Sequence, residues 1–269
     1  MRQLVSKLKY YFKIYYFLSR FSILSVLIYR INALVIGLAP IVWLATMLIF
    51  LATIFSRVKQ LGGWSFWEIV FLTGIHEIIF LLVWTIFAPN LRRFIKEVRT
   101  GEFDQVLLKP ISPRFMASFR FLDFSSFGSF LNAIFVFFYS FNQVKHLIDF
   151  TRLAGFLLFL FIGFWTAYFV YFIFSSLALF FINSQTLFEW TFDLTDFDRY
   201  PAEIYHSWVR VLLTFFLPIL FFAYFPTAFL LGKVGWSYLF LGVAILFVLY
   251  FLSHYIWHAG LRHYQSASS

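Results

Sequence analysis

The residues best placed to do chemistry are ionisable side chains inside long apolar runs. His76 and Glu77 lie in the middle of one such run, from Phe66 to Phe87. Burying an ionisable group in a membrane is costly, so such a pair is by default a candidate for a substrate path or a proton relay. The alternative is a pair that a neighbouring helix or a second subunit neutralises. His76 and Glu77 are therefore our candidate pathway residues.

Two other polar clusters have spacings that resemble metal sites. Asp193, Asp196 and Asp198 invite comparison with a calcium loop, but the glycine and the distal glutamate of such a loop are missing. His254 and His258 are one helical turn apart, with no carboxylate or third ligand beside them. We expect a solvated acidic loop in the first case and an interfacial role in the second. No Ser/His/Asp arrangement can be placed, so we expect neither a catalytic residue nor a metal site.

A third candidate is the polar stretch Gly101–Pro113, with the sequence GEFDQVLLKPISP, between two apolar runs. The Gly start, the two acids and the Pro stop predict a short helix outside the bilayer. Leu107 and Leu108 need a cover, so we expect this helix to dock against a partner whose basic groups pair with the acids. The alternative is a plain loop that only orients the protein. The predicted docking residues are Gly101, Glu102, Phe103, Asp104, Leu107, Leu108, Lys109 and Pro110.

The elements that must position these residues are membrane helices. The 269 residues are 62% hydrophobic and 12% charged. This composition, with apolar runs of 20 or more residues, is typical of integral membrane proteins. The net charge of +9 is then attributed to cytoplasmic loops and anionic lipid headgroups, and no nucleic acid is expected. The absence of cysteine excludes disulfides and thiolate metal sites.

The apolar runs predict an all-α membrane protein with six spans in a single transmembrane domain. The expected spans are 31–55, 66–87, 121–141, 153–182, 211–231 and 236–257. Within the domain we expect an interfacial helix at 1–30, spans 1–2 in 31–89, a cytoplasmic loop at 90–120, spans 3–4 in 121–182, a cytoplasmic acidic loop at 183–210, spans 5–6 in 211–257 and a tail at 258–269.

The N-terminal segment and the charge distribution predict the orientation. On a helix, Lys9, Lys13 and Arg20 lie opposite an apolar face, which is typical of an amphipathic helix in the membrane interface; the alternative is a solvated, frayed N-terminus. Together with Arg30 they are our predicted membrane-interface residues. The segments expected inside carry 16 Lys and Arg, and those expected outside carry 5. Both termini and the 90–120 loop should therefore be cytoplasmic.

Four stretches in order resemble the permeases of ABC-2 type transporters, in particular small bacterial permeases that work as pairs. GEFDQVLLKPISP is similar to the segment G-x-(L/F)-D-x-x-L-x-(K/R)-P that follows the second span in these proteins. The other three are Tyr29-Arg30, Arg199–Tyr205 (RYPAEIY) and Leu212–Pro218 (LLTFFLP) followed by YFP. The acidity before Arg199 is a departure from the family pattern.

The resemblance implies the transmembrane subunit of an ABC exporter in the inner membrane, with the region around Gly101–Pro113 as the coupling helix. Its partners would be two copies of a separate ATPase and a second, non-identical permease, all surrounded by membrane lipids. ATP and Mg would bind the ATPase, because this chain has no G-x-x-x-x-G-K-[ST] and is not expected to be an enzyme. In this family the region before the last span forms a re-entrant hairpin at the outer face, and Pro218 and Pro226 fit such a break; the alternative is one kinked span.

Two other functions stay open on the sequence. One is a secondary carrier, driven by an ion gradient, that uses His76 and Glu77 as its coupling site. The other is a membrane assembly subunit without transport activity.

Overall fold

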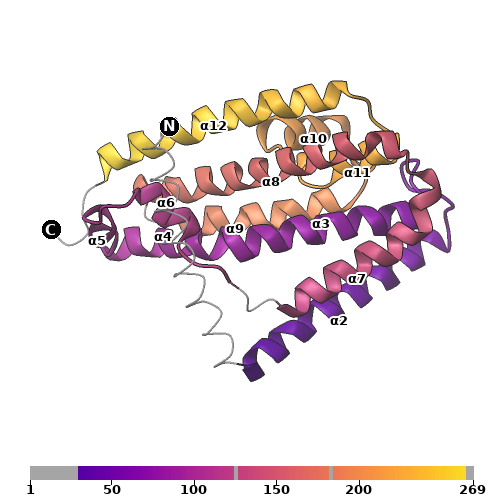
Figure 1. The fold of residues 1–269 in the computed structure, drawn as a ribbon, viewed down its shortest axis with the longest axis horizontal. Helices are drawn as coiled ribbons and strands as arrows, with labels where there is room; N and C mark the ends of the chain where they lie inside the picture. Colours follow the sequence, from indigo (N-terminus) through magenta and orange to yellow (C-terminus); the bar gives the residue numbers. More distant parts are fainter. Residues whose placement is uncertain (1–29, 124–126, 182–183, 265–269) are drawn as a thin grey trace, which may run out of the picture.

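The computed structural model describes residues 30–264 except 124–126 and 182–183, and this part of the chain is helical without a β-strand. Figure 1 shows long helices that run side by side along the longest axis, with short helices at both ends. The longer helices are α2 (Arg30–Phe55), α3 (Phe66–Ile86), α4 (Ala88–Thr100), α7 (Phe127–Val144), α8 (Leu153–Ser176), α9 (Ser184–Thr195) and α12 (Ser237–His263). The shorter helices are α5 (Phe103–Leu107), α6 (Pro113–Phe119), α10 (Ser207–Val211) and α11 (Tyr224–Leu230).

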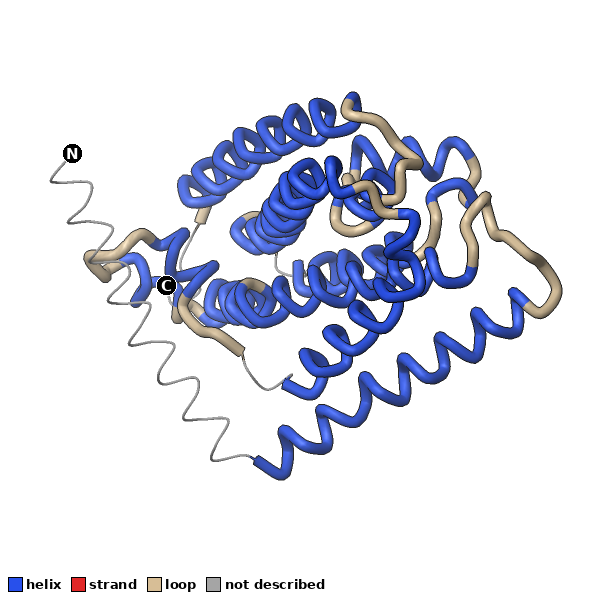
Figure 2. Tube along the Cα trace, turned by 45° about the vertical axis from the view of Figure 1, so that its right-hand side comes forward, coloured by secondary structure: helices blue, strands red, loops and turns tan. Residues whose placement is uncertain are grey.

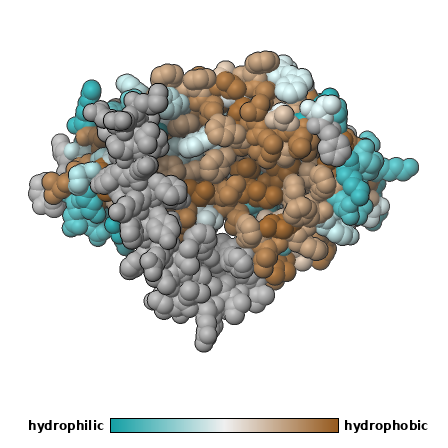
Figure 3. All heavy atoms as spheres, in the orientation of Figure 1, coloured by the Kyte–Doolittle hydropathy of each residue, from teal (hydrophilic) through white to brown (hydrophobic). Residues whose placement is uncertain are grey.

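Hydropathy defines the direction of the membrane normal. In Figure 3, hydrophilic residues gather at the two ends of the long axis and hydrophobic residues cover the middle. Three described helices are long and apolar enough to cross a membrane, namely Phe66–Ile86, Leu153–Leu179 and Ser237–His263. Ile41–Phe55 in α2 is a shorter apolar helix. The all-helical membrane class expected from the composition is therefore confirmed.

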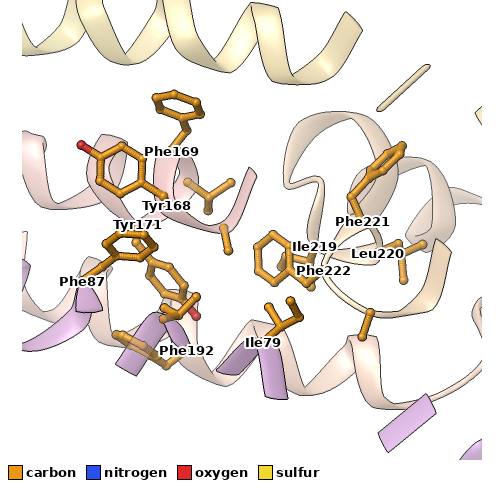
Figure 4. Packing of buried hydrophobic residues seen from close by; sticks show 14 of the residues in the cluster. Ile79, Phe87, Tyr168, Phe169, Tyr171, Phe192, Ile219, Leu220, Phe221 and Phe222 are labelled. Atoms are coloured by element: carbon orange, nitrogen blue, oxygen red, sulfur yellow. The ribbon is translucent and has the colours of Figure 1, made fainter. Parts of the chain in front are cut away.

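The helices pack in a fixed order around α3 and α8. α7 lies against α2 and α3, while α12 lies against α8; Figure 2 shows α2 at the periphery of the bundle. Aromatic rings fill the centre between α3, α8 and α9 (Figure 4). The ring of Tyr171 stacks on that of Phe192 with the ring centres 4.4 Å apart, and the ring centres of Tyr168 and Phe87 are 4.8 Å apart. This explains a part of the high Phe and Tyr content as core packing.

The expected loop at 90–120 contains α4, which begins directly after α3. Pro89 lies in the first turn of α4, where a backbone N–H has no helical partner, so proline is tolerated. The proline therefore does not stop the chain from continuing as a helix, because only Phe87 separates the end of α3 from the start of α4. The two together carry the chain well beyond the apolar middle, to the end of the molecule where α5 and α6 lie (Figure 1).

The expected acidic loop at 183–210 is wrong for most of its length. Ser184–Thr195 forms α9, which packs against α8 and α4. Phe188 and Phe192 are buried one turn apart, so an apolar stripe lies within the acidic sequence. Asp193 and Asp196 are exposed as expected, but Asp198 is fully buried.

The same segment also crosses from one end of the molecule to the other. Arg92 of α4 pairs with Glu189 in the middle of α9. Further along the chain, Glu203 accepts a hydrogen bond from Trp64 Nε1 at 3.1 Å, in the connection before α3. Since α4 and Trp64 lie at opposite ends of the bundle, residues 184–205 traverse it.

A hairpin follows, and the two prolines have different roles in it. Its first limb is α10 and a π-helical turn from Leu212 to Phe216, and the chain reverses at Leu217 and Pro218. The second limb includes α11, where Pro226 occupies the third position and costs no helical hydrogen bond. Pro218 therefore lies at the break, as expected, whereas the break predicted at Pro226 is not present.

Candidate functional site

The candidate docking helix is held at the end of α4 by a glycine turn. α4 buries Leu91, Phe94 and Val98 on one face and exposes cationic side chains on the other. Gly101 then adopts φ +78°, a left-handed conformation that caps the helix and redirects the chain into α5. Only glycine adopts this conformation without a steric penalty, which explains why the motif begins with Gly.

The inner face of α5 is anchored in an aromatic cluster. Phe103 is fully buried, and its ring lies 5.1 Å from Phe94 of α4, 6.3 Å from Trp257 of α12 and 5.5 Å from Tyr264. Val106, one turn later, is also buried. Phe103 was predicted as a docking residue, but its side chain faces the bundle and instead fixes α5 to two other helices.

The outer face of α5 is open and has an apolar tip. Leu108 is 86% exposed and Leu107 is 39% exposed. Glu102, Lys109 and Pro110 are exposed beside them. An apolar tip flanked by one charge of each sign, at a polar end of the molecule, is typical of a surface that binds another protein.

Asp104 is half-buried and belongs to the supporting side of α5. It lies near Tyr264, which follows α12. Burial, together with the negative charge of Asp104, raises the pKa of Tyr264 from 10.0 to about 12. The direction of the shift shows that the neutral form of the tyrosine is favoured beside the carboxylate.

Ion pairs connect the docking end to the membrane helices. Glu97 of α4 accepts hydrogen bonds from Arg93 at 2.7 Å and from Arg120, just after α6, at 2.9 Å. Arg114 of α6 donates to Ser253 Oγ of α12 at 3.0 Å and lies over the ring of Phe172 of α8. These contacts link α6 and the residue after it to α4, α8 and α12. The sequence showed these residues only as a basic cluster.

His76 and Glu77 lie deep in α3 and find their partners within the same chain. Glu77 pairs with Arg199 at 3.0 Å, and Arg199 also pairs with Asp196 at 2.9 Å. His76 Nδ1 lies 3.6 Å from Asp198 Oδ2. The structure thus favours the alternative in which a neighbouring segment neutralises the pair. Sequence reasoning missed these partners because they lie more than 100 residues further along the chain.

We call the group of His76, Glu77, Asp198 and Arg199 the buried junction, and the exposed Asp196 lies at its edge. The buried junction connects four parts of the fold, namely α3, the segment after α9, the start of α11 and α2. Asp198 Oδ1 accepts the backbone N–H of Tyr224 at 3.0 Å, at the start of α11. The Arg199 guanidinium lies 3.8 Å from the centre of the Trp43 ring on α2.

A small cavity adjoins the junction, with a volume of about 10 Å³. His76, Tyr171 and Thr195 contribute polar atoms to its wall. Both ring nitrogens of His76 and the hydroxyl of Tyr171 lack a hydrogen-bond partner among the described residues. The volume is about that of one water molecule, so the cavity is too small for a transported solute.

The end opposite α5 is closed by a second polar cluster. Glu203, in the RYPAEIY stretch, accepts hydrogen bonds from Trp64 Nε1 and, at 2.7 Å, from Tyr224 Oη. Lys233 pairs with Glu68 at 2.9 Å and donates to the Gly63 carbonyl at 3.0 Å. These contacts hold the start of α3 to the hairpin. They also explain why the RYPAEIY stretch contains an acidic residue, Glu203.

The remaining predicted sites are partly outside the described residues. Lys9, Lys13 and Arg20 lie outside the described residues, and Arg30 is the first residue of α2. His254 and His258 are exposed on α12 with ring centres 4.1 Å apart. Among the described residues, no group of three or more His, Asp or Glu could hold a metal ion.

Comparison with known families agrees with this architecture. Residues 41–268 match the model of the ABC-2 family transporter protein. The match covers most of the chain, so the protein belongs to this family of membrane transport components. The resemblance to ABC-2 permeases is therefore confirmed, and three of the four motifs lie within the matched residues, while Tyr29-Arg30 precedes them. Neither a curated protein nor a solved structure matches the chain.

Proposed function

We propose that the chain is the permease subunit of an ATP-driven ABC-2 exporter and that the tip of α5 docks into a separate ATPase. The observation that carries the proposal is the combination of a Leu108 side chain that is 86% exposed with a Phe103 side chain that is fully buried. The helix is rigidly supported on one face and free on the other. Such a helix can receive a push and pass it on to the membrane helices.

The proposed topology has six crossings of the inner membrane. They are α2, α3 with α4, α7, α8, the 184–205 segment and α12, with the 207–230 hairpin entering from the end opposite α5. In this topology Arg199 and Arg210 move from the α5 side to the opposite side. The α5 side then carries 14 Lys and Arg, and the opposite side carries 7. The bias still supports a cytoplasmic α5 end and two cytoplasmic termini.

The proposed mechanism begins on the ATPase, which would bind ATP and Mg and close. Closure would press on α5, and the Glu97 and Arg114 contacts would transmit the displacement to α4, α8 and α12. The crossings would then reorient around a path between this permease and a second, non-identical one. We expect two permeases and two ATPases in the complex. The pairing of Glu77 with Arg199 supports a structural role for the buried junction rather than that of an ion-coupling site.

Co-purification from native membranes tests the proposal. An ATPase should accompany the wild type and be lost from the double variant Glu102→Lys, Leu108→Asp. The matched control makes a similar change at the opposite end, Val58→Asp, Lys59→Glu, where both residues are also exposed. The control should retain the ATPase. Equal retention by both variants, or no ATPase with the wild type, would contradict the proposal.

A further inference from the structure

A cavity of about 410 Å³ lies at the α5 end of the bundle, separate from the docking tip. It opens between the end of α4, the turn after α8 and the end of α12, which come together at that end in Figure 1. Its apolar wall includes Ile95 and Val98 of α4 together with Leu179 and Phe180. Its volume is in the range of sites that bind small organic ligands, roughly 300–1,000 Å³.

The polar side of the cavity is basic. Arg99 and His263 line it, and none of the lining residues is acidic. Arg92 and Arg93 of the same helix are paired with glutamates, but Arg99 forms no ion pair with a described residue. An unpaired guanidinium beside an apolar wall is suited to an anionic amphiphile, because it provides two of the donors that a phosphate accepts.

A buried hydroxyl also faces this cavity without a partner. Ser184, the first residue of α9, is 1% exposed, and its Oγ has no hydrogen-bond partner among the described residues. A buried hydroxyl without a hydrogen bond is destabilising, so a partner for it is expected. An oxygen of a bound ligand would satisfy it.

We propose that this cavity binds a membrane phospholipid with an anionic headgroup, from the leaflet on the α5 side. The phosphate lies at Arg99, within reach of the Ser184 hydroxyl, and the upper part of an acyl chain lies along Ile95, Val98 and Leu179. The position supports this ligand, because α12 passes there from the apolar middle of the molecule to its polar end. Basic pockets between helices at this depth are typical of headgroup sites. The proposal does not depend on docking of an ATPase.

The test compares lipid binding by the purified full-length chain in detergent, measured by native mass spectrometry. Phosphatidylglycerol and phosphatidylcholine with identical acyl chains serve as probes. The wild type should prefer phosphatidylglycerol, and Arg99→Gln should reduce its binding about tenfold, the effect of one charge-assisted hydrogen bond. The matched control is Lys96→Gln, one turn away on α4, exposed and outside the cavity. It should change binding less than twofold.

Two further measurements separate lipid binding from other causes. Ala178→Leu fills part of the cavity without a change of charge and should also weaken phosphatidylglycerol binding. An excess of inorganic phosphate should not displace the lipid, because the apolar wall contributes to affinity. Equal binding of the two lipids, equal loss in Lys96→Gln and Arg99→Gln, unchanged binding in Ala178→Leu, or displacement by inorganic phosphate would each overturn the proposal.

Discussion

The ion pair between Glu77 and Arg199 should contribute far more to stability than the pair between Arg92 and Glu189. The side chains of Glu77 and Arg199 are 14% and 9% exposed, against 37% and 36% for Glu189 and Arg92. Loss of one partner of a buried pair costs about 3–5 kcal/mol because the other charge stays buried. A surface pair is worth about 0–1 kcal/mol.

The expected cost of Glu77→Gln lies just below that range. Arg199 keeps two other contacts, with Asp196, which is 58% exposed, and with the Trp43 ring. These offset part of the loss, so we expect about 2–3 kcal/mol. For a chain of this size 1 kcal/mol corresponds to roughly 2–4 °C in Tm, which predicts a decrease of about 4–12 °C.

Thermal unfolding of purified protein in detergent measures this effect. Glu189→Gln is the matched control, since it is the same substitution in the half-exposed pair, and it should lower Tm by less than about 4 °C. The double variant Glu77→Gln, Arg199→Gln removes both charges and should be clearly more stable than the sum of the two single effects implies. Equal shifts for Glu77→Gln and Glu189→Gln, or additive effects in the double variant, would refute the reasoning.

Three further predictions concern packing, orientation and titration. Gly163→Ala should cost about 1–3 kcal/mol in an unfolding assay, because its Cβ would meet the backbone oxygens of the hairpin, whereas Gly235→Ala, with open space around it, should be neutral. The chain has no cysteine, so single-cysteine variants report the orientation of the protein in the membrane. A membrane-impermeant maleimide added to intact cells should label Lys59→Cys and not Lys109→Cys. The reverse labelling pattern would contradict a cytoplasmic α5 end. Tyr264 should ionise near pH 12, and the measurement is the tyrosinate absorbance that the wild type shows and Tyr264→Phe lacks. Between about pH 10 and 12 the folded chain keeps a proton that the unfolded chain releases, so the free energy of unfolding falls as the pH rises. Ionisation of Tyr264 at pH 10 would contradict its packing against Asp104.

Three of the expected spans and the short helix α5 could be predicted from the sequence because their signals are local, whereas the expected span at 211–231 is a broken hairpin in the structure. Length and hydropathy alone define helices such as Phe66–Ile86 and Ser237–His263. The Gly start of the GEFDQVLLKP motif predicts a turn, and Leu108 in a charged interval predicts an exposed tip. Each of these signals lies within a few residues of the feature that it predicts.

The role of the acidic segment could not be predicted, because it depends on contacts across the chain. Asp198 is buried only because His76 and the N–H of Tyr224 lie beside it. Arg199 is buried only because Glu77, 122 residues earlier in the chain, neutralises it. Without those partners, an acidic stretch is expected to be solvated. The inward orientation of Phe103 likewise depends on Trp257 and Tyr264, which are distant in sequence.

Cysteine crosslinking tests the central claim, that the tip of α5 contacts an ATPase, most directly. Leu108→Cys places a reactive group at the most exposed apolar position of the tip, and Val58→Cys, 41% exposed at the opposite end, is the control. With a short maleimide–diazirine reagent in native membranes, the maleimide reacts with the introduced cysteine, and on illumination the diazirine loses N₂ and inserts into a bond of whatever lies beside it. Leu108→Cys should then give a crosslinked species that contains an ABC ATPase, and Val58→Cys should not. The absence of that species from Leu108→Cys, or its appearance with both variants, would contradict docking at α5.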